Sequence, residues 1–422
     1  MLTRRRLISA GALGAAGALT GCTSLRPELA RADIARRAPD PGSIAGAVDA
    51  VGSFGADLLE AVAPAGNVVC SPFSVLTALA MVRLGATGET AREMDETLHL
   101  PRLDALNAGL NALDQTLATR GGRRRTGDDT KATVTMDLAN RVWGQRGSTW
   151  EPAFLEALAT SYGTGVGELD IAGNPERARK RLNAWVADQT HDHITDLLPP
   201  RSVTPRTRLL LANALYVRAP WHEPFQPQSP LPFRTPGGPV PVPMMGVSLR
   251  QAGLVGSGWQ AARVPLAGRE LALTLILPRG ELAELRRELG GTGLVELLRT
   301  DPIREVDVSL PPMRLRSVLP LNPVLAGLGM PRAFTPLAEL DGLTTAERLQ
   351  IGVVEHQGWI AIDEEGLEAA AATAVTAVPV SAPPRPPLRL VFDRPFLACV
   401  HDVATALPLL VLQVSDPSLR DR

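Results

Sequence analysis

The chain has 422 residues, with 43 basic and 44 acidic side chains and a formal net charge of -1 at pH 7. Its hydrophobic fraction of 45% and charged fraction of 21% are those of a globular protein, which excludes bulk disorder and a collagen-like repeat. The balanced charge argues against nucleic-acid binding or binding to a membrane surface as the dominant role of the chain. Three cysteines are too few for a disulfide scaffold, and a chain this long can bury enough surface without one.

The first residues have the pattern of an export signal. Arg4, Arg5 and Arg6 precede an Ala/Gly/Leu stretch that is too short and too weakly apolar to span a membrane permanently. Leu19-Thr20-Gly21-Cys22 resembles a bacterial lipobox, in which the cysteine is acylated and becomes the mature N-terminus. A transmembrane anchor or a chance cysteine is the alternative.

We therefore expect residues 1–21 to be a twin-arginine lipoprotein signal peptide and Cys22 to carry lipid. Residues 22–45 are small, proline-rich and charged, which predicts a flexible tether. The protein would then be exported, and either anchored by this lipid to the outer face of the cell membrane or extracellular.

Helices are predicted first along the remaining chain. Apolar residues recur at three- and four-residue steps over residues 46–63, which predicts an amphipathic helix. Ser71 and Pro72 form a helix start, followed by the apolar run of a buried helix. Thr90 and Glu93 form a capping-box pattern at the start of the next helix. Residues 121–127 hold three arginines and predict a solvated loop, with polyanion binding as the alternative.

Strands are predicted mainly in the second half of the chain. The apolar and β-branched runs that predict them cover residues 209–217, 271–277, 306–310, 351–362 and 409–414. Helices that precede strands, without regular alternation, favour the α+β class over a doubly wound sheet. With no internal repeat and no further linker, we expect one domain over residues 46–418.

Sites of enzymatic chemistry are absent from the sequence. It contains no His-Glu-x-x-His, Gly-x-Ser-x-Gly or P-loop motif, so we expect no catalytic residues, no cofactor and no enzyme activity. His191-Asp192-His193 is at most half of a metal site, because no further ligands follow at zinc-like spacing. Cys70 and Cys399 lie in apolar stretches and are expected to be buried free thiols, and a Cα separation beyond about 7 Å would exclude a disulfide.

Several motifs, in order, resemble the serpin family of serine protease inhibitors. They are Asn67 to Ser74, the turn Leu84 to Ala91, Leu211 to Val217 with Trp221 to Phe225, His356, Asp363 to Gly366, Glu368 to Thr373, and Asp393 to Phe396. The resemblance covers about residues 46–416. It implies a serpin fold with three β-sheets, eight or nine helices and an exposed reactive-centre loop.

The resemblance also implies a mechanism of inhibition. A serine protease cuts the loop, which then enters the main sheet as a new strand and carries the acylated protease with it. The hinge at which entry begins corresponds to Glu364, Glu365, Gly366, Leu367, Glu368, Ala369, Ala370, Ala371, Ala372 and Thr373. An entering strand needs its N–H groups and small or apolar inward side chains, and this segment has no proline before Pro379. Its one outward charge, Glu368, can stay in water when the strand has entered the sheet. Without the flanking motifs, such an Ala/Val run would indicate a buried helix or a low-complexity linker.

The family's loop spacing places the reactive bond at Val380-Ser381. The preceding residues suit an elastase- or subtilisin-like serine protease, the partner we expect for a monomeric inhibitor. Arg385 is a competing candidate, but Pro386 follows it and the longer inserting segment would hold three prolines. A register error would instead move the bond to Thr376 or Val378.

Two further groups of residues correspond to functional regions of the family. Ser71, Ser74, Asn213 and His356 match the shutter, a hydrogen-bonded cluster beneath the main sheet, and Trp221 and Glu364 match the breach, where loop entry begins. The sequence departs from the family at Leu367, where Thr or Ser is usual, and at Pro312, where a breach lysine is usual. Arg314, on the same strand face, is the possible substitute. These departures leave a non-inhibitory binding or structural protein as the alternative.

Overall fold

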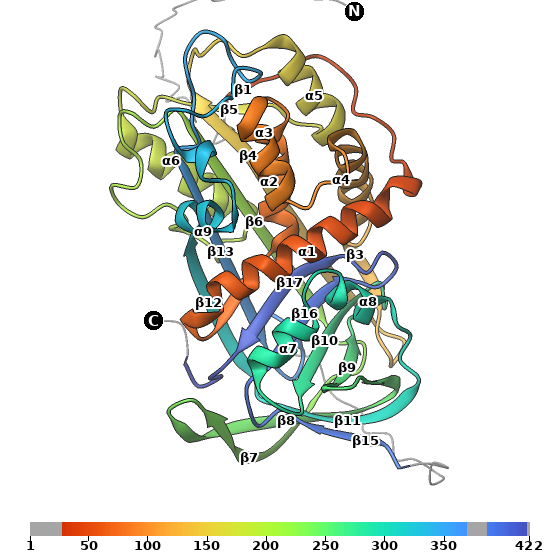
Figure 1. The fold of residues 1–422 in the computed structure, drawn as a ribbon. Coiled ribbons are helices and arrows are strands. Elements are labelled where there is room, and N and C mark those ends of the chain that lie inside the picture. Colours follow the sequence, from red (N-terminus) through yellow and green to blue (C-terminus); the bar gives the residue numbers. More distant parts are fainter. Residues whose placement is uncertain (1–27, 369–385, 420–422) are drawn as a thin grey trace, which may run out of the picture.

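The computed structural model (Figure 1) describes residues 28–368 and 386–419. Within these it contains nine α-helices and two hydrogen-bonded strand networks. The helices are α1 Ile44–Val62, α2 Pro72–Arg83, α3 Gly88–Thr97, α4 Leu103–Leu117, α5 Pro152–Tyr162, α6 Pro175–Gln189, α7 Leu282–Glu288, α8 Gly293–Arg299 and α9 Leu321–Leu328. The α+β class and the predicted helix count are confirmed.

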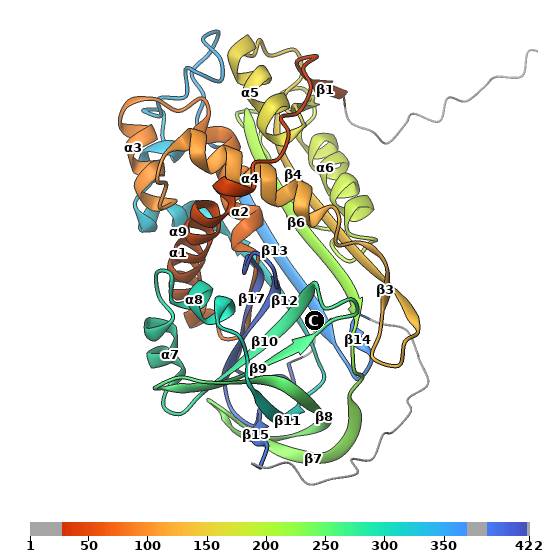
Figure 2. The same ribbon diagram turned by 90° about the vertical axis from the view of Figure 1, so that its right-hand side faces the viewer.

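The first network, sheet A, contains eight of the described strands. They are β1 Glu28–Ala30, β3 Gly122–Arg125, β4 Lys131–Gln145, β5 Val166–Leu169, β6 Leu209–Pro220, β12 Met313–Pro320, β13 Val353–Ile362 and β14 Gly366–Leu367. The main order is β1-β5-β4-β6-β14-β13-β12, and β3 pairs with β4 outside this path. The short strand β14 therefore lies between the long neighbours β6 and β13, as Figure 2 shows.

The second network, sheet B, contains nine of the described strands. They are β2 Val68–Cys70, β7 Gln226–Thr235, β8 Gly238–Val255, β9 Trp259–Pro265, β10 Leu271–Pro278, β11 Arg304–Leu310, β15 Leu388–Val391, β16 Phe396–Asp402 and β17 Pro408–Val414. β8 pairs with β7 and β11 along most of its length and with β9 near its end. This long strand joins two of the three expected sheets into one network.

Sheet A is covered on both faces. α2 is buried along almost its whole length against one face, where the main core also includes α1 and sheet B. α6 packs on the opposite face, over a second core that contains Trp143, Leu182 and Leu210 (Figure 2). α1 buries the apolar stripe predicted for it, including Val48, Val51 and Leu58. No helix in the described part of the chain is long and apolar enough to cross a membrane.

The segment predicted as a flexible tether is docked onto the domain from residue 28 onward. β1 pairs antiparallel with β5 at the edge of sheet A. The Arg36 side chain donates to Asn111 of α4 at 2.8 Å and forms an ion pair with Asp114 at 2.7 Å. The expectation was wrong for residues 28–45, because charged side chains and an unpaired sheet edge found partners that composition does not reveal. The rest of the expected tether, residues 22–27, lies outside the described residues.

Two local expectations also need correction. Residues 121–127 include β3, and Arg124 and Arg125 form ion pairs with Glu270 and Asp129, so the predicted loop is part of a hairpin. The helix predicted to follow Thr90 begins at Gly88 instead. Its first amides are capped by Glu339, whose carboxylate accepts hydrogen bonds from the N–H groups of residues 89 and 90. These backbone bonds, with Arg332 nearby, lower the pKa of Glu339.

Candidate functional site

The candidate site is the seam of sheet A between β6 and β13. These strands pair in parallel where Leu210–Asn213 face Val353–His356, and this ladder ends at the pair Asn213–His356. At the other end of the seam β14 occupies the space, with Leu367 opposite Ala219 of β6 and Ile362 of β13. Between these two points neither strand has the other as a ladder partner within the described residues. Within the described residues the seam is therefore closed by the β6–β13 ladder at one end and holds β14 at the other.

The described part of the hinge begins with a tight turn. The Asp363 carboxylate accepts hydrogen bonds from the N–H groups of residues 365 and 366 at 3.0 and 3.2 Å. At Gly366 a Cβ atom would lie 2.4 Å from the Ala219 carbonyl oxygen, so only glycine lets β14 approach β6 this closely. Among the predicted hinge residues, Glu364 to Glu368 are described, and Ala369 to Thr373 lie outside the described residues.

The two hinge residues that follow the turn are already in the sheet or at its edge. Leu367 is fully buried, so the leucine that departs from the family pattern is accommodated at the first inserting position. In the uncleaved protein Glu368 is only partly exposed to water. Its carboxylate contacts Nε2 of His193 at 2.5 Å, and its side chain is only 22% exposed. His193 follows α6, and the sequence did not indicate that this segment reaches the hinge.

Trp221 holds the predicted breach together through two hydrogen bonds to backbone carbonyls. Trp221 is buried, its indole N–H donates to the Asp363 carbonyl at 2.8 Å, and its backbone N–H donates to the carbonyl of residue 365. Glu364 contributes its carbonyl, which accepts from the Phe225 N–H at 2.9 Å. The expected substitute pair is not found, because no ion pair in the described part of the chain joins Glu364 to Arg314. Arg314 is exposed on β12, while Glu364 lies in the turn that precedes β14.

The four predicted shutter residues form one buried hydrogen-bonded cluster. The Ser71 N–H donates to His356 Nε2 at 2.9 Å, and the Ser71 hydroxyl contacts the Ser74 hydroxyl at 3.1 Å. Since Nε2 accepts, the proton is on Nδ1, which donates to Asn213 Oδ1 at 2.6 Å. Ser71 caps α2 and Asn213 lies on β6, so the cluster connects the helix beneath sheet A to both sides of the seam.

The electrostatics of the shutter hold His356 neutral. The imidazole is only 1% exposed, and burial lowers its pKa from the ordinary 6.5 to about 4. A proton on Nε2 would also face the Ser71 N–H, which is a donor. The arrangement therefore requires one tautomer and disfavours the charged ring.

Sequence reasoning missed two polar residues of this region. Asn140 of β4 lies directly opposite Asn213, and its side-chain oxygen and the Asn213 amide nitrogen are buried without hydrogen-bond partners among the described residues. Ser317 of β12 accepts from the Val69 N–H at 2.9 Å, directly beside the cluster. Both lie on strands that the sequence pattern did not identify, so no register was available to find them.

The two remaining cysteines are buried and free, as expected. Cys70 and Cys399 both pair with Val411, from opposite sides of β17. Strands two positions apart are separated by about 9.5 Å, which is beyond the reach of a disulfide. Burial raises the pKa of both thiols, so neither is activated for chemistry.

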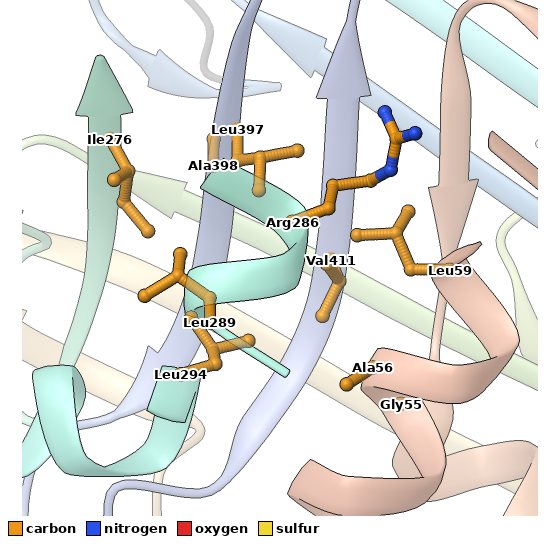
Figure 3. A pocket seen from close by; sticks show the side chains of 10 residues that line it. All are labelled: Gly55, Ala56, Leu59, Ile276, Arg286, Leu289, Leu294, Leu397, Ala398 and Val411. Atoms are coloured by element: carbon orange, nitrogen blue, oxygen red, sulfur yellow. The ribbon is translucent and has the colours of Figure 1, made fainter. Parts of the chain in front are cut away.

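Other candidate sites carry little chemistry. The nitrogens of His191 and His193 contact the carboxylates of Asp137 and Glu368, and no cluster of metal ligands occurs in the described part of the chain. A pocket between α1, α7 and sheet B is lined by Leu59, Leu289 and Val411 (Figure 3), and its free volume is about 20 Å³. That space holds about one water molecule. The predicted lipidation site Cys22, the signal peptide 1–21 and the reactive bond Val380-Ser381 lie outside the described residues.

Comparison with known proteins identifies the family of this chain. The model of the family Serpin (serine protease inhibitor) matches residues 49–417. A serpin-like protein of Thermococcus kodakarensis is 33% identical over 88% of this chain and 85% of its own length. The leukocyte elastase inhibitor of Homo sapiens is 30% identical over 86% of this chain and 97% of its own. The native crystal structure of the thermophilic serpin tengpin covers 92% of this chain and 97% of its own, with a TM-score of 0.78 and 22% identity. The chain therefore belongs to the serpin family, whose members include inhibitors of serine proteases.

Proposed function

We propose that this protein inhibits elastase- or subtilisin-like serine proteases by suicide trapping. The protease would cleave Val380-Ser381, and the freed loop would enter the seam between β6 and β13 before the acyl bond is hydrolysed. The observation that carries this proposal is β14. Its residues Gly366 and Leu367 already occupy the seam, in the register that a full inserted strand would continue. The similarity to leukocyte elastase inhibitors supports the choice of target class.

Continuing the β14 register defines what insertion must displace. Residue 372 would reach the end of the unpaired part of the seam, opposite Ala214, and Thr373 would fall between Asn213 and His356. Entry past this point requires separation of the ladder that Asn213 and His356 begin. The shutter is thus the first closed pair that a moving strand meets, and its hydrogen bonds set part of the barrier.

The test is to mix the protein with an elastase-like protease and examine the products on a denaturing gel. We expect a covalent complex, together with a large increase in thermal stability after cleavage of the loop. The matched control is Thr373→Arg, which keeps the scissile bond but places a charge where the strand would enter the core. It should be cleaved without forming a complex.

The alternative is a non-inhibitory serpin-fold binding or structural protein. The shortness of β14 favours it, because Glu368 has a left-handed φ of +51° directly after the buried Leu367. Cleavage of the wild-type protein at Val380-Ser381 as an ordinary substrate, with no complex and no stabilisation, would support this alternative over trapping.

We also propose that the inhibitor is an exported lipoprotein attached through Cys22. The arrangement of Arg4, Arg5 and Arg6 before an apolar stretch and a lipobox-like cysteine supports this. Metabolic labelling with a fatty acid should mark the wild-type protein. A Cys22→Ser variant should lose the label and leave the membrane fraction, and a label retained by this variant would contradict the proposal.

A further inference from the structure

The Glu368–His193 contact lies at the place where strand β14 stops. The Glu368 N–H donates to the Ala361 carbonyl at 3.1 Å, and its own carbonyl accepts from Arg218 Nε at 2.7 Å, so the residue is bonded to both walls of the seam. Its φ of +51° is nevertheless left-handed, which turns the chain out of the strand at a cost for a residue with a side chain. The side chain of Glu368 pairs with His193 at 2.5 Å.

The His193 ring spans the seam. It stacks on Tyr216 of β6 with ring centroids 5.4 Å apart and on Trp359 of β13 at 4.3 Å. The β6–β13 ladder, continued by three residues from Asn213–His356, places Tyr216 directly opposite Trp359. His193 therefore covers the seam in the part where β6 and β13 are not paired with each other.

The same register identifies what has to pass beneath the ring. β14, continued by three residues from Leu367, places residue 370 of an inserted strand between Tyr216 and Trp359. Side chains alternate between faces, so the side chain at position 370 would share the face of Tyr216 and Trp359 and point at His193. The His193 ring must therefore leave its position over Tyr216 and Trp359 before an inserted strand can occupy this part of the seam.

We propose that the Glu368–His193 pair is a latch that arrests the reactive-centre loop after Leu367 has entered sheet A. The carboxylate fastens the ring over the seam, and the ring blocks the position that residue 370 needs. The arrested loop then lies in a local free-energy minimum. It can leave this minimum by withdrawal of β14 from sheet A or by full insertion. The effect of the latch on full insertion rests on the proposed inhibitory function, whereas its anchoring of β14 does not.

The first test measures amide hydrogen exchange over Gly366–Glu368 in a Glu368→Gln variant. Loss of the carboxylate–imidazole contact should make the minimum shallower, so these amides should exchange about fivefold faster or more. The matched control is Asp137→Asn, because Asp137 makes the same type of contact with His191 of the same segment, at 2.8 Å, without touching the hinge. Unchanged exchange in Glu368→Gln, or an equal increase in Asp137→Asn, would overturn the latch.

The second test follows forward insertion in the same variants. Glu368→Gln should form covalent complex with an elastase-like protease faster than the wild type, whereas Asp137→Asn should match the wild type. Fluorescence emission from Trp359 reports the position of the His193 ring that stacks on it. The emission spectrum of the uncleaved Glu368→Gln protein should already shift toward that of the cleaved wild type. A Trp359→Phe background should abolish this shift. An unchanged rate or an unchanged spectrum would contradict the arrest. If the wild type forms no complex, the proposed function fails and the exchange measurement alone decides the role of the pair.

Discussion

Replacement of His356 by glutamine should remove part of the acid sensitivity of this protein. The wild-type imidazole has its pKa lowered from 6.5 to about 4 by burial, so the unfolded state binds this proton more tightly than the native state. The stability that depends on neutral His356 is therefore present above pH 6.5 and is lost as the pH falls toward 4. At 1.36 kcal/mol for each pH unit, the loss between pH 8 and pH 5 is about 2 kcal/mol.

Glutamine is the suitable replacement because it can make both bonds of the ring without titrating. Its oxygen can accept from the Ser71 N–H, and its amide can donate to Asn213. The free energy of unfolding, measured by denaturant titration of the first transition at pH 8 and pH 5, should fall about 2 kcal/mol less in His356→Gln than in the wild type. Equal losses would refute the assignment.

The second buried histidine supplies a matched control. Burial lowers the pKa of His401 to about 3, and its ring contacts Thr274 of β10 in sheet B, away from the seam. His401→Gln should also reduce the pH dependence of unfolding. Only His356→Gln should slow the formation of polymers or inserted forms at pH 5, because only His356 belongs to the ladder that insertion opens. A slowing of similar size in both variants would show that general stability, and not the shutter, controls insertion.

Three further predictions concern the loop, its hinge and a buried acid. Val380→Arg should gain trypsin-like targets, and if Val378→Arg gains them instead, the reactive bond lies two residues earlier. Gly366→Ala should lower the free energy of unfolding by about 1–3 kcal/mol, because its Cβ would lie 2.4 Å from the Ala219 carbonyl, and a stability equal to the wild type by denaturant titration would contradict this close approach. Burial raises the pKa of Glu355 to about 7, so ionisation destabilises the native state as the pH rises from 4.5 toward 7. The free energy of unfolding of Glu355→Gln should therefore exceed that of the wild type at pH 8 by up to about 3 kcal/mol, and the difference should vanish at pH 4. A difference that is the same at both pH values would refute this.

The sequence predicted elements where one local signal was sufficient. Apolar periodicity identified α1, and the run of residues 209–217 identified β6, because both signals lie within a single element. Partners from distant parts of the chain were not predictable. Thr90 and Glu93 matched a capping box, but the first turn of α3 is capped by Glu339, some 250 residues away.

In the candidate site, too, local motifs were predictable and contacts between distant segments were not. Motif resemblance brought Ser71, Ser74, Asn213 and His356 together correctly as a hydrogen-bonded cluster. It could not show that a histidine after α6 would reach the hinge, because that contact depends on how α6 and the segment after it cross sheet A. It also could not show that Asn140 lies opposite Asn213, since pairing register depends on both strands.

The most direct test of suicide trapping is the intact mass of the species formed with an elastase-like protease under denaturing conditions. β15, β16 and β17 follow the predicted cut and belong to sheet B, so the C-terminal fragment should stay bound until the protein is denatured. We expect an acyl-linked species that contains the inhibitor up to Val380 and the whole protease, together with a released fragment that begins at Ser381. Free protease with two inhibitor fragments and no linked species would contradict trapping.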